Sequence, residues 1–327
     1  MTLSAPTPRV QPEPGLPARV TVYEVGPRDG LQAETDIIPS SIKAELCRRL
    51  YVAGTTNLEV TSFVSPAWIP QLADAAEVVA AVEVPSGARA VALVPNLRGL
   101  QRAVDAGIRE VAVVVSATES FAKANLNNTR AGAIDRAVEV IAAASAQGIP
   151  VRGYVSMAFG DPWEGAVATD AVTAAAAELH AAGARTIALG DTIGVATPGL
   201  TTRVVTETLA AGIPLDAVAL HLHDTYGQSL ANVHAALRLG VAEFDAAVGG
   251  LGRCPYAKGA TGNLATEDLV WMLHGLGIET GLDLRALAAT TEWLSRARGI
   301  RAPSNVARAL AAAGLDTPDT ALEASQA

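Results

Sequence analysis

Residues 186–224, TIALGDTIGVATPGLTTRVVTETLAAGIPLDAVALHLHD, decide the fold. Two short apolar runs in this stretch, Thr186–Gly190 and Ala217–Leu222, are typical of buried strands. The longer stretch between the runs fits a helix, and each run ends in polar residues. A strand, a helix and a second strand in this order predict a parallel pair of strands with a helix covering one face.

The same unit repeats along most of the chain. Strands are predicted at Val20–Val25, Asn57–Phe63, Ala90–Val94, Glu110–Ser116, Val151–Ala158, Thr186–Gly190, Ala217–Leu222 and Glu243–Val248. Helical periods lie between them, for example at Ser40–Ala53, Asp74–Val82, Ile134–Gln147, Ala171–Ala182 and Ser229–Leu239. Eight βα units in about 230 residues match a (β/α)8 TIM barrel, which is an α/β fold. A doubly wound open sheet is the alternative.

The two ends of the chain differ from this repeat. Residues 1–18 hold five prolines and no helical period, which predicts a flexible arm rather than a secretory signal. Residues 19–327 are expected to form a single barrel domain, because no linker interrupts the βα units. The region after Gly262 is expected to add helices to the barrel, as a lid or as a dimer surface.

Composition excludes several classes of protein. The chain has 327 residues, of which 50% are hydrophobic and 17% are charged, so global disorder is excluded. No run reaches the ~20 apolar residues that a membrane-spanning helix needs. A net charge of −9 argues against a nucleic-acid partner. The two cysteines, Cys47 and Cys254, form no disulfide framework and fit a reducing cytoplasm.

Polar residues gather where the predicted strands end. In a barrel these ends share one face, whose loops line the mouth. Polar residues at or just after these ends are Arg28, Asp29, Glu59, Asn96, Asp191, His221, His223, Cys254, Lys258 and Asn263. The sequence therefore predicts a functional site at the mouth of the barrel.

Two histidines at the end of the seventh strand suggest a metal site. His221 and His223 are two positions apart, so both imidazoles point to the same face of the strand. With the Asp29 carboxylate and the Asn263 amide oxygen they would form a site rich in oxygen ligands. Such a site favours Mg²⁺ or Mn²⁺ over a closed structural zinc. A pair of hydrogen-bonded structural histidines is the alternative.

Arg28 and Cys254 are candidates for the chemistry itself. Arg28 is a fixed cation that could stabilise an oxyanion, although a surface ion pair with Asp29 is the alternative. Cys254 lies in a glycine-rich loop near Arg253 and Lys258, whose charges would lower the thiol pKa and favour a nucleophile or proton donor. A buried inert cysteine is the alternative for Cys254.

Two carboxylates, Glu59 and Asp191, stand near the ends of the second and sixth strands. Either could act as a general base or orient a metal ligand. A salt bridge without a catalytic role is the alternative for both. The glycines at 249–252 form neither GxxxxGK[ST] nor GxGxxG, which excludes a phosphate-binding loop of those types.

Seven motifs resemble the 3-hydroxy-3-methylglutaryl-CoA (HMG-CoA) lyase family in order and spacing. They read EVGPRDGLQAE (24–34), TSFVSPAW (61–68), VPNLRG (94–99), RGYVSMAFGDPWEG (152–165), LGDTIGVATPG (189–199), HLHDTYGQSLAN (221–232) and GLGRCPYAKGATGNLATEDLV (250–270). Several are long and nearly uninterrupted, so the resemblance is specific. Members of this family are metal-dependent TIM-barrel lyases that cleave HMG-CoA to acetyl-CoA and acetoacetate.

The resemblance implies a role for each candidate residue. The residues that correspond to the family's ligands of the divalent cation are Asp29, His221, His223 and Asn263. Arg28 would hold the enolate oxygen of acetyl-CoA, and Cys254 would protonate the enolate carbon. Glu59, Asp191 and one histidine, with His221 as the candidate, would share the base and orienting roles. The family also implies a homodimer.

The sequence departs from the family's pattern in the cysteine loop. Arg253 stands where a glycine is usual, and Lys258 stands where glutamine or proline is usual. Asn96, Arg253 and Lys258 are predicted to contact the CoA part of the substrate. The departures leave open a longer substrate, such as 3-hydroxy-3-isohexenylglutaryl-CoA. A Claisen condensing transferase of the isopropylmalate or homocitrate synthase type, and a metal-binding barrel without catalysis, are further alternatives.

Overall fold

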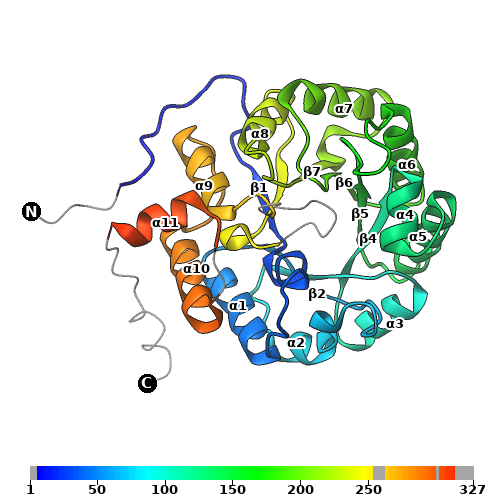
Figure 1. Ribbon diagram of the computed structural model, residues 1–327, viewed down its shortest axis with the longest axis horizontal. Coiled ribbons are helices and arrows are strands. Elements are labelled where there is room, and N and C mark those ends of the chain that lie inside the picture. Colours follow the sequence, from blue (N-terminus) through cyan, green and yellow to red (C-terminus); the bar gives the residue numbers. More distant parts are fainter. Residues whose placement is uncertain (1–5, 253–261, 300–301, 314–327) are drawn as a thin grey trace, which may run out of the picture.

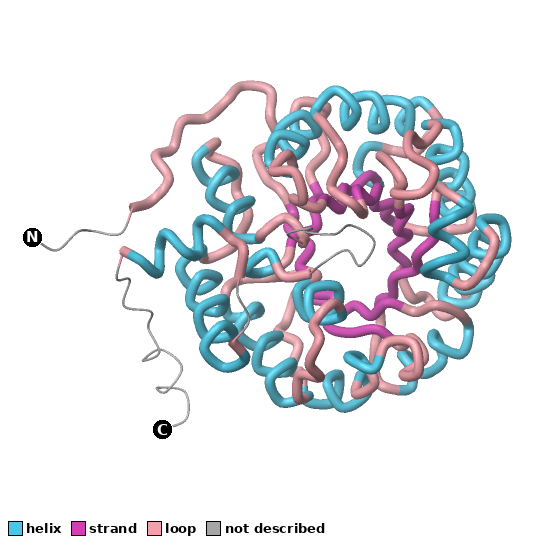
Figure 2. Tube along the Cα trace, viewed as in Figure 1, coloured by secondary structure: helices cyan, strands magenta, loops and turns pink. Residues whose placement is uncertain are grey.

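Eight parallel strands close into a barrel in the order of the chain, and the eighth strand pairs with the first. The computed structural model describes residues 6–252, 262–299 and 302–313. Figure 2 shows the strands as an inner ring enclosed by helices. The prediction of a (β/α)8 barrel is confirmed, and the doubly wound open sheet is excluded.

The strands begin and end within two residues of the predicted bounds. They are β1 (Thr21–Glu24), β2 (Asn57–Ser62), β3 (Arg89–Leu93), β4 (Glu110–Ser116), β5 (Val151–Ser156), β6 (Thr186–Asp191), β7 (Val218–Leu222) and β8 (Glu243–Ala246). The ring closes where β8 lies between β7 and β1. In this register Asp245 is opposite His221 on one side and opposite Tyr23 on the other.

Helices cover the outside of the ring (Figure 1). They are α1 (Ser40–Val52), α2 (Ala75–Ala81), α3 (Leu97–Asp105), α4 (Glu119–Leu126), α5 (Arg130–Ser145), α6 (Thr169–Ala181), α7 (Pro198–Ala210), α8 (Ser229–Leu237), α9 (Thr266–Gly275), α10 (Leu284–Arg298) and α11 (Asn305–Ala312). Helix α5 begins earlier than the predicted Ile134, because the Thr129 hydroxyl caps it by accepting from the Gly132 N–H at 3.0 Å. No helix in the described part of the chain is long and apolar enough to cross a membrane.

The expected C-terminal helices are present as α9, α10 and α11. They lie on the outside of the ring, with α10 packed against α1 (Figure 1). Four single turns are also present among the described residues: η1 (Gly26–Gly30), η2 (Pro70–Leu72), η3 (Leu215–Ala217) and η4 (Val248–Gly250). The first and the last follow β1 and β8, and therefore lie at the end of the barrel where the site was predicted.

The described part of the N-terminal arm contains neither helix nor strand. It contacts the outside of the barrel near α8 and α9. The Gln11 N–H donates to the carbonyl of Gly275 at 2.8 Å. The Glu13 carboxylate pairs with His234 at 2.9 Å and with Arg238 at 2.6 Å. These contacts link the arm to the last turns of two helices.

The interior of the barrel is unusually polar. Barrels of this kind are commonly filled with branched apolar side chains. Here a group of fully buried polar side chains comes from four of the strands, namely Tyr23, Glu59, Arg152, Tyr154 and Asp245. Buried charges are stable only when they are paired and hydrogen-bonded. This group lies directly beneath the predicted site and is described with it below.

Candidate metal and catalytic site

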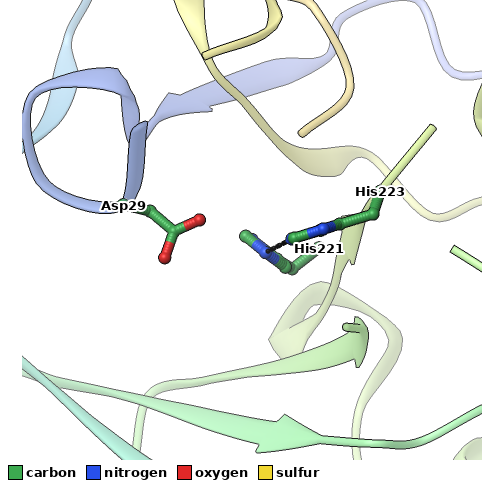
Figure 3. Close-up of side chains that lie close together, drawn as sticks. All are labelled: Asp29, His221 and His223. Carbon is green, nitrogen blue, oxygen red and sulfur yellow. Dashed lines mark hydrogen bonds between the residues drawn. The ribbon is translucent and has the colours of Figure 1, made fainter. Parts of the chain in front are cut away.

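Asp29, His221 and His223 come together at one end of the barrel (Figure 3). One carboxylate oxygen and one nitrogen of each imidazole lie within 4.8 Å of one another. The Nε2 atoms of the two histidines are 3.2 Å apart. The expectation that both imidazoles point to the same side of β7 is therefore met, and the Asp29 side chain faces them from the segment after β1.

The local fold explains how Asp29 reaches the histidines. Asp29 lies in η1, a π-helical turn that begins directly after β1, and its N–H donates to the carbonyl of Val25 at 2.8 Å. Glycine at position 26 leaves room for the Glu24 carboxylate, because a Cβ atom here would lie 2.6 Å from Oε1 of Glu24 and would displace it. A wide turn of this type often marks a functional site. It carries the carboxylate from the wall of the barrel into its mouth.

Asn263 adds an amide to the cluster. An isolated antiparallel bridge pairs this residue with His223. Its Nδ2 donates to Oδ2 of Asp29 at 2.8 Å and to the carbonyl of Leu251 at 2.9 Å. Its Oδ1 is buried and has no hydrogen-bond partner within residues 6–252, 262–299 and 302–313. A buried acceptor without a donor beside a carboxylate and two imidazoles is suited to a cation.

The protonation states of His223 and Asp29 also suit a cation. Burial and the charge of His221 lower the pKa of His223 to about 3, so this imidazole is neutral at pH 7. Burial raises the pKa of Asp29, but Arg28 and both histidines outweigh it and hold that pKa well below its usual range. A neutral imidazole, an ionised carboxylate and an amide oxygen fit Mg²⁺ or Mn²⁺. The donors present are therefore compatible with the predicted metal.

Arg28 is held between two carboxylates. Its Nη1 pairs with Oδ1 of Asp29, and its Nε pairs with Oε1 of Glu59. The other oxygen of Glu59 accepts from the hydroxyls of Tyr23, at 3.1 Å, and Tyr154, at 2.9 Å. Glu59 is completely buried, so it contacts Arg28 from inside the barrel rather than from the mouth. A surface ion pair is excluded for Arg28, whose exposed fraction is 7%.

Asp191 lies at the end of β6, and both of its oxygens are occupied. They accept from the backbone N–H groups of Val195 at 2.9 Å and Ala196 at 3.0 Å, which holds the loop that follows β6. Burial raises the pKa of Asp191 to about 6, against the opposing effect of these hydrogen bonds and of His221. In the structure, the Asp191 carboxylate therefore fixes the backbone of the loop that follows β6. Its role as a base stays a prediction.

The predicted CoA contacts are only partly described. Asn96 is exposed at the mouth, where its Oδ1 caps α3 by accepting from the Gly99 N–H at 2.9 Å. Arg253, Cys254 and Lys258 lie outside the described residues. On either side of that segment, Gly252 and Gly262 are close together, since a Cβ atom on Gly262 would lie 2.2 Å from the Gly252 carbonyl oxygen.

Sequence reasoning missed two residues beneath the site, Asp245 and Arg152. Oδ2 of Asp245 is 3.0 Å from Nδ1 of His221, and its Oδ1 accepts from the Arg152 guanidinium. Both were inside predicted strands, where a charged side chain is unusual. A charge in a strand expected to be buried on both faces requires a partner. That rule could have identified both residues.

Comparisons with known proteins agree with the geometry. A family model described as HMGL-like matches residues 19–294. A curated relative from Mus musculus, "3-hydroxy-3-methylglutaryl-CoA lyase, cytoplasmic", is 49% identical over 296 residues, covering 90% of this chain and 86% of the relative. The solved hydroxymethylglutaryl-CoA lyase of Pseudomonas aeruginosa aligns with a TM-score of 0.88 and 45% identity, covering 91% of this chain and 99% of that chain.

A second solved structure carries ligands. It is an HMG-CoA lyase from Acinetobacter baumannii in complex with coenzyme A and 3-methylmalate. It aligns with a TM-score of 0.85 and 38% identity, covering 92% of this chain and 97% of that chain. These similarities extend over the barrel and over the segments that carry the site.

Proposed function

The chain belongs to the HMGL-like family, and from this we propose that it is a divalent-metal-dependent lyase that cleaves HMG-CoA to acetyl-CoA and acetoacetate. The observation that carries the proposal is the convergence of Asp29, His221 and His223 beside the buried guanidinium of Arg28. The curated mouse relative and the solved bacterial structures bear the name of this enzyme.

The proposed metal ligands are Asp29, His221, His223 and Asn263. A divalent cation held there supplies Lewis acidity, which lowers the pKa of the substrate's tertiary hydroxyl. Mg²⁺ and Mn²⁺ are both compatible with one carboxylate, two imidazoles and one amide oxygen. The Oδ1 atom of Asn263 is buried and has no hydrogen-bond partner among the described residues, which supports Asn263 as one of the ligands.

The reaction is a retro-Claisen cleavage. A base removes the proton of the tertiary hydroxyl, and the carbon–carbon bond beside it breaks as the new ketone forms. The electron pair of that bond moves into the thioester and gives the enolate of acetyl-CoA. Arg28 is fixed by Glu59 and Asp29 and is proposed to stabilise the enolate oxygen. Cys254 is proposed to return a proton to the enolate carbon.

The base and orienting roles belong to Glu59, Asp191 and His221. The contacts of Glu59 favour an orienting role, because one oxygen pairs with Arg28 and the other accepts from two tyrosine hydroxyls. Asp191 is a candidate base, since its pKa of about 6 lies close to neutral pH. His221 stays a candidate as well.

The substrate is tested by incubating the protein with HMG-CoA and Mg²⁺ or Mn²⁺, with EDTA as the control, and measuring acetoacetate. We expect product only with the metal. Turnover of a 3-hydroxy-3-isohexenylglutaryl thioester in place of HMG-CoA would redirect the assignment to the longer substrate. Condensation of acetyl-CoA with a 2-oxo acid would redirect it to the condensing transferases, and metal binding without any turnover would contradict the proposal.

The same proposal includes the CoA contacts Asn96, Arg253 and Lys258, a homodimer and a cytoplasmic location. The solved relative from Acinetobacter baumannii binds coenzyme A, which supports a CoA thioester as the partner. The mouse relative is described as cytoplasmic, which supports the location, whereas a relative from Arabidopsis thaliana of the same identity is described as mitochondrial. Light scattering after size exclusion measures the mass in solution, and a value near one chain, 33.4 kDa, would contradict the dimer.

A further inference from the structure

We propose that Asp245 is a positioning residue for the metal site: its carboxylate, held by Arg152, keeps the proton of His221 on Nδ1 and presents Nε2 to the cation. The proposal rests on the proposed function, because it takes His221 as a metal ligand. It goes further by assigning a role to two buried residues, Asp245 and Arg152, that are not among the proposed metal ligands.

The position of Asp245 is set by the closure of the barrel. Strands β7 and β8 pair with His221 opposite Asp245, so the two side chains lie next to each other inside the ring. Oδ2 of Asp245 is 3.0 Å from Nδ1 of His221. Asp245 is 1% exposed and His221 is 9% exposed, so little solvent competes for this contact.

The contact decides which nitrogen of His221 carries the proton. A carboxylate only accepts hydrogen bonds, so in the neutral imidazole Nδ1 must donate and Nε2 keeps its lone pair. Nε2 is the atom that faces Nε2 of His223, and one ring nitrogen of each histidine lies within 4.8 Å of an Asp29 oxygen. By contrast, Nδ1 of His223 is buried and has no hydrogen-bond partner in the described chain. His221 is therefore the histidine whose tautomer is set before a cation binds.

Arg152 holds the Asp245 carboxylate in place. The guanidinium on β5 lies between the carboxylates of Asp245 and Glu243, both on β8. It also lies over the rings of Tyr23, at 4.1 Å from the centroid, and Tyr154, at 5.2 Å. A guanidinium fixed on several sides orients the neighbouring carboxylate, so that Oδ1 of Asp245 stays on Arg152 and Oδ2 faces His221.

The substitution Asp245→Asn tests the proposal. The Arg152 guanidinium can donate only to the amide oxygen, which turns the amide NH₂ toward Nδ1 of His221. Nδ1 must then accept, and the proton moves to Nε2, where it blocks the cation. Glu243→Gln is the matched control, because it removes the other carboxylate of the same guanidinium without contacting His221.

Mn²⁺ affinity, measured by calorimetry on protein freed of metal by chelation, is the first readout. Asp245→Asn should weaken binding by about 10–100-fold, the usual cost of losing a group that orients a metal ligand. Glu243→Gln should bind as tightly as the unaltered chain. Equal affinity of Asp245→Asn and the unaltered chain would overturn the inference. Failure of the unaltered chain to bind Mn²⁺ would instead contradict the proposed function, and the inference with it.

The tautomer of His221 is the second readout, and it needs no substitution at Asp245. In protein labelled with ¹⁵N-histidine, at about pH 9 where imidazole is neutral, the ring nitrogens of His221 report where the proton lies. We expect the proton on Nδ1 in the unaltered chain and on Nε2 in Asp245→Asn. A proton on Nε2 in the unaltered chain would overturn the inference even if the variant did not fold.

Discussion

The Glu59 carboxylate binds the Arg28 guanidinium from inside the barrel, while Asp29 binds it at the mouth. Arg28 and Glu59 are both buried. Arg28 is thus bound by one carboxylate beneath the site, Glu59, and by one that belongs to the proposed metal cluster, Asp29. This arrangement predicts that the position of the guanidinium and the binding of the metal can be changed separately.

Glu59→Gln should affect turnover more than metal binding. A neutral amide cannot hold Arg28 as firmly, so the guanidinium would stabilise the enolate less well, and we expect kcat to fall by about 10–100-fold. Mn²⁺ affinity should change little, because Glu59 does not contact the cluster. Steady-state kinetics and calorimetry measure the two effects. Glu45→Gln, which removes surface ion pairs of Arg48 and Arg49, is the control, and full activity of Glu59→Gln would contradict the assigned role.

Asp29→Ala should impair both metal binding and turnover. The substitution removes one proposed ligand and one of the two carboxylates on Arg28. Loss of an orienting group alone costs about 10–100-fold in metal affinity, so loss of a ligand should cost at least as much. Calorimetric titration with Mn²⁺ gives the affinity. A variant that kept both its affinity and its rate would show that the metal site lies elsewhere.

Cys254→Ser should separate the chemistry from the metal. We expect turnover to fall by about 10²–10⁴-fold, because a hydroxyl is a much weaker acid than a thiol, while Mn²⁺ affinity is retained. Cys47→Ala is the matched control: that thiol is completely buried in α1, and burial raises its pKa. Acetoacetate formation by the two variants is the comparison. Equal rates for both would remove Cys254 from the mechanism.

Glu267 should make the stability of the fold depend on pH. Burial raises the pKa of its carboxyl to about 8, although Thr291 and the Gly249 N–H donate to it. The folded chain thus binds this proton more tightly than the unfolded chain. Its contribution to stability is complete below the ordinary pKa of 4.5 and is lost as the pH rises through the folded value of about 8.

Glu267→Gln, which stays neutral, should therefore remove this dependence. Relative to the unaltered chain, its free energy of unfolding should be similar near about pH 5 and higher by about 1–3 kcal/mol near about pH 9. Urea unfolding across this range measures the difference. Glu279→Gln, at an exposed ion pair with Arg19, is the control and should follow the unaltered chain. Parallel curves for Glu267→Gln and the unaltered chain would contradict the prediction.

Most of the fold could be predicted because parallel strands buried on both faces leave a strong pattern in the sequence. Apolar runs and helical periods located each βα unit. Helix boundaries were less certain, since the N-cap Thr129, which begins α5, lies outside the apolar pattern of that helix. The paired histidines were visible because a spacing of two has only one consequence on a strand.

The contacts beneath the site were not visible in the same way. The partnership of Asp245 with His221 depends on the register between β7 and β8, which no local pattern reports. The contacts of Asp191 depend on the course of the loop that follows it, whose N–H groups occupy both oxygens. Local sequence shows which residue types reach the mouth of the barrel, and tertiary pairing decides which partner each one meets.

The hydrogen bond between Asn263 and Asp29 joins residues 234 positions apart in the chain. Contacts of such long range form late in folding, because a large loop must close first. The cluster of carboxylate, imidazoles and amide consequently cannot assemble until β8 has joined β7 to β1. A nascent chain that lacks its last strand has no complete binding site, and a cation that selects the closed ring would stabilise it by mass action. Metal binding would then selectively stabilise chains in which all eight strands have closed into the ring.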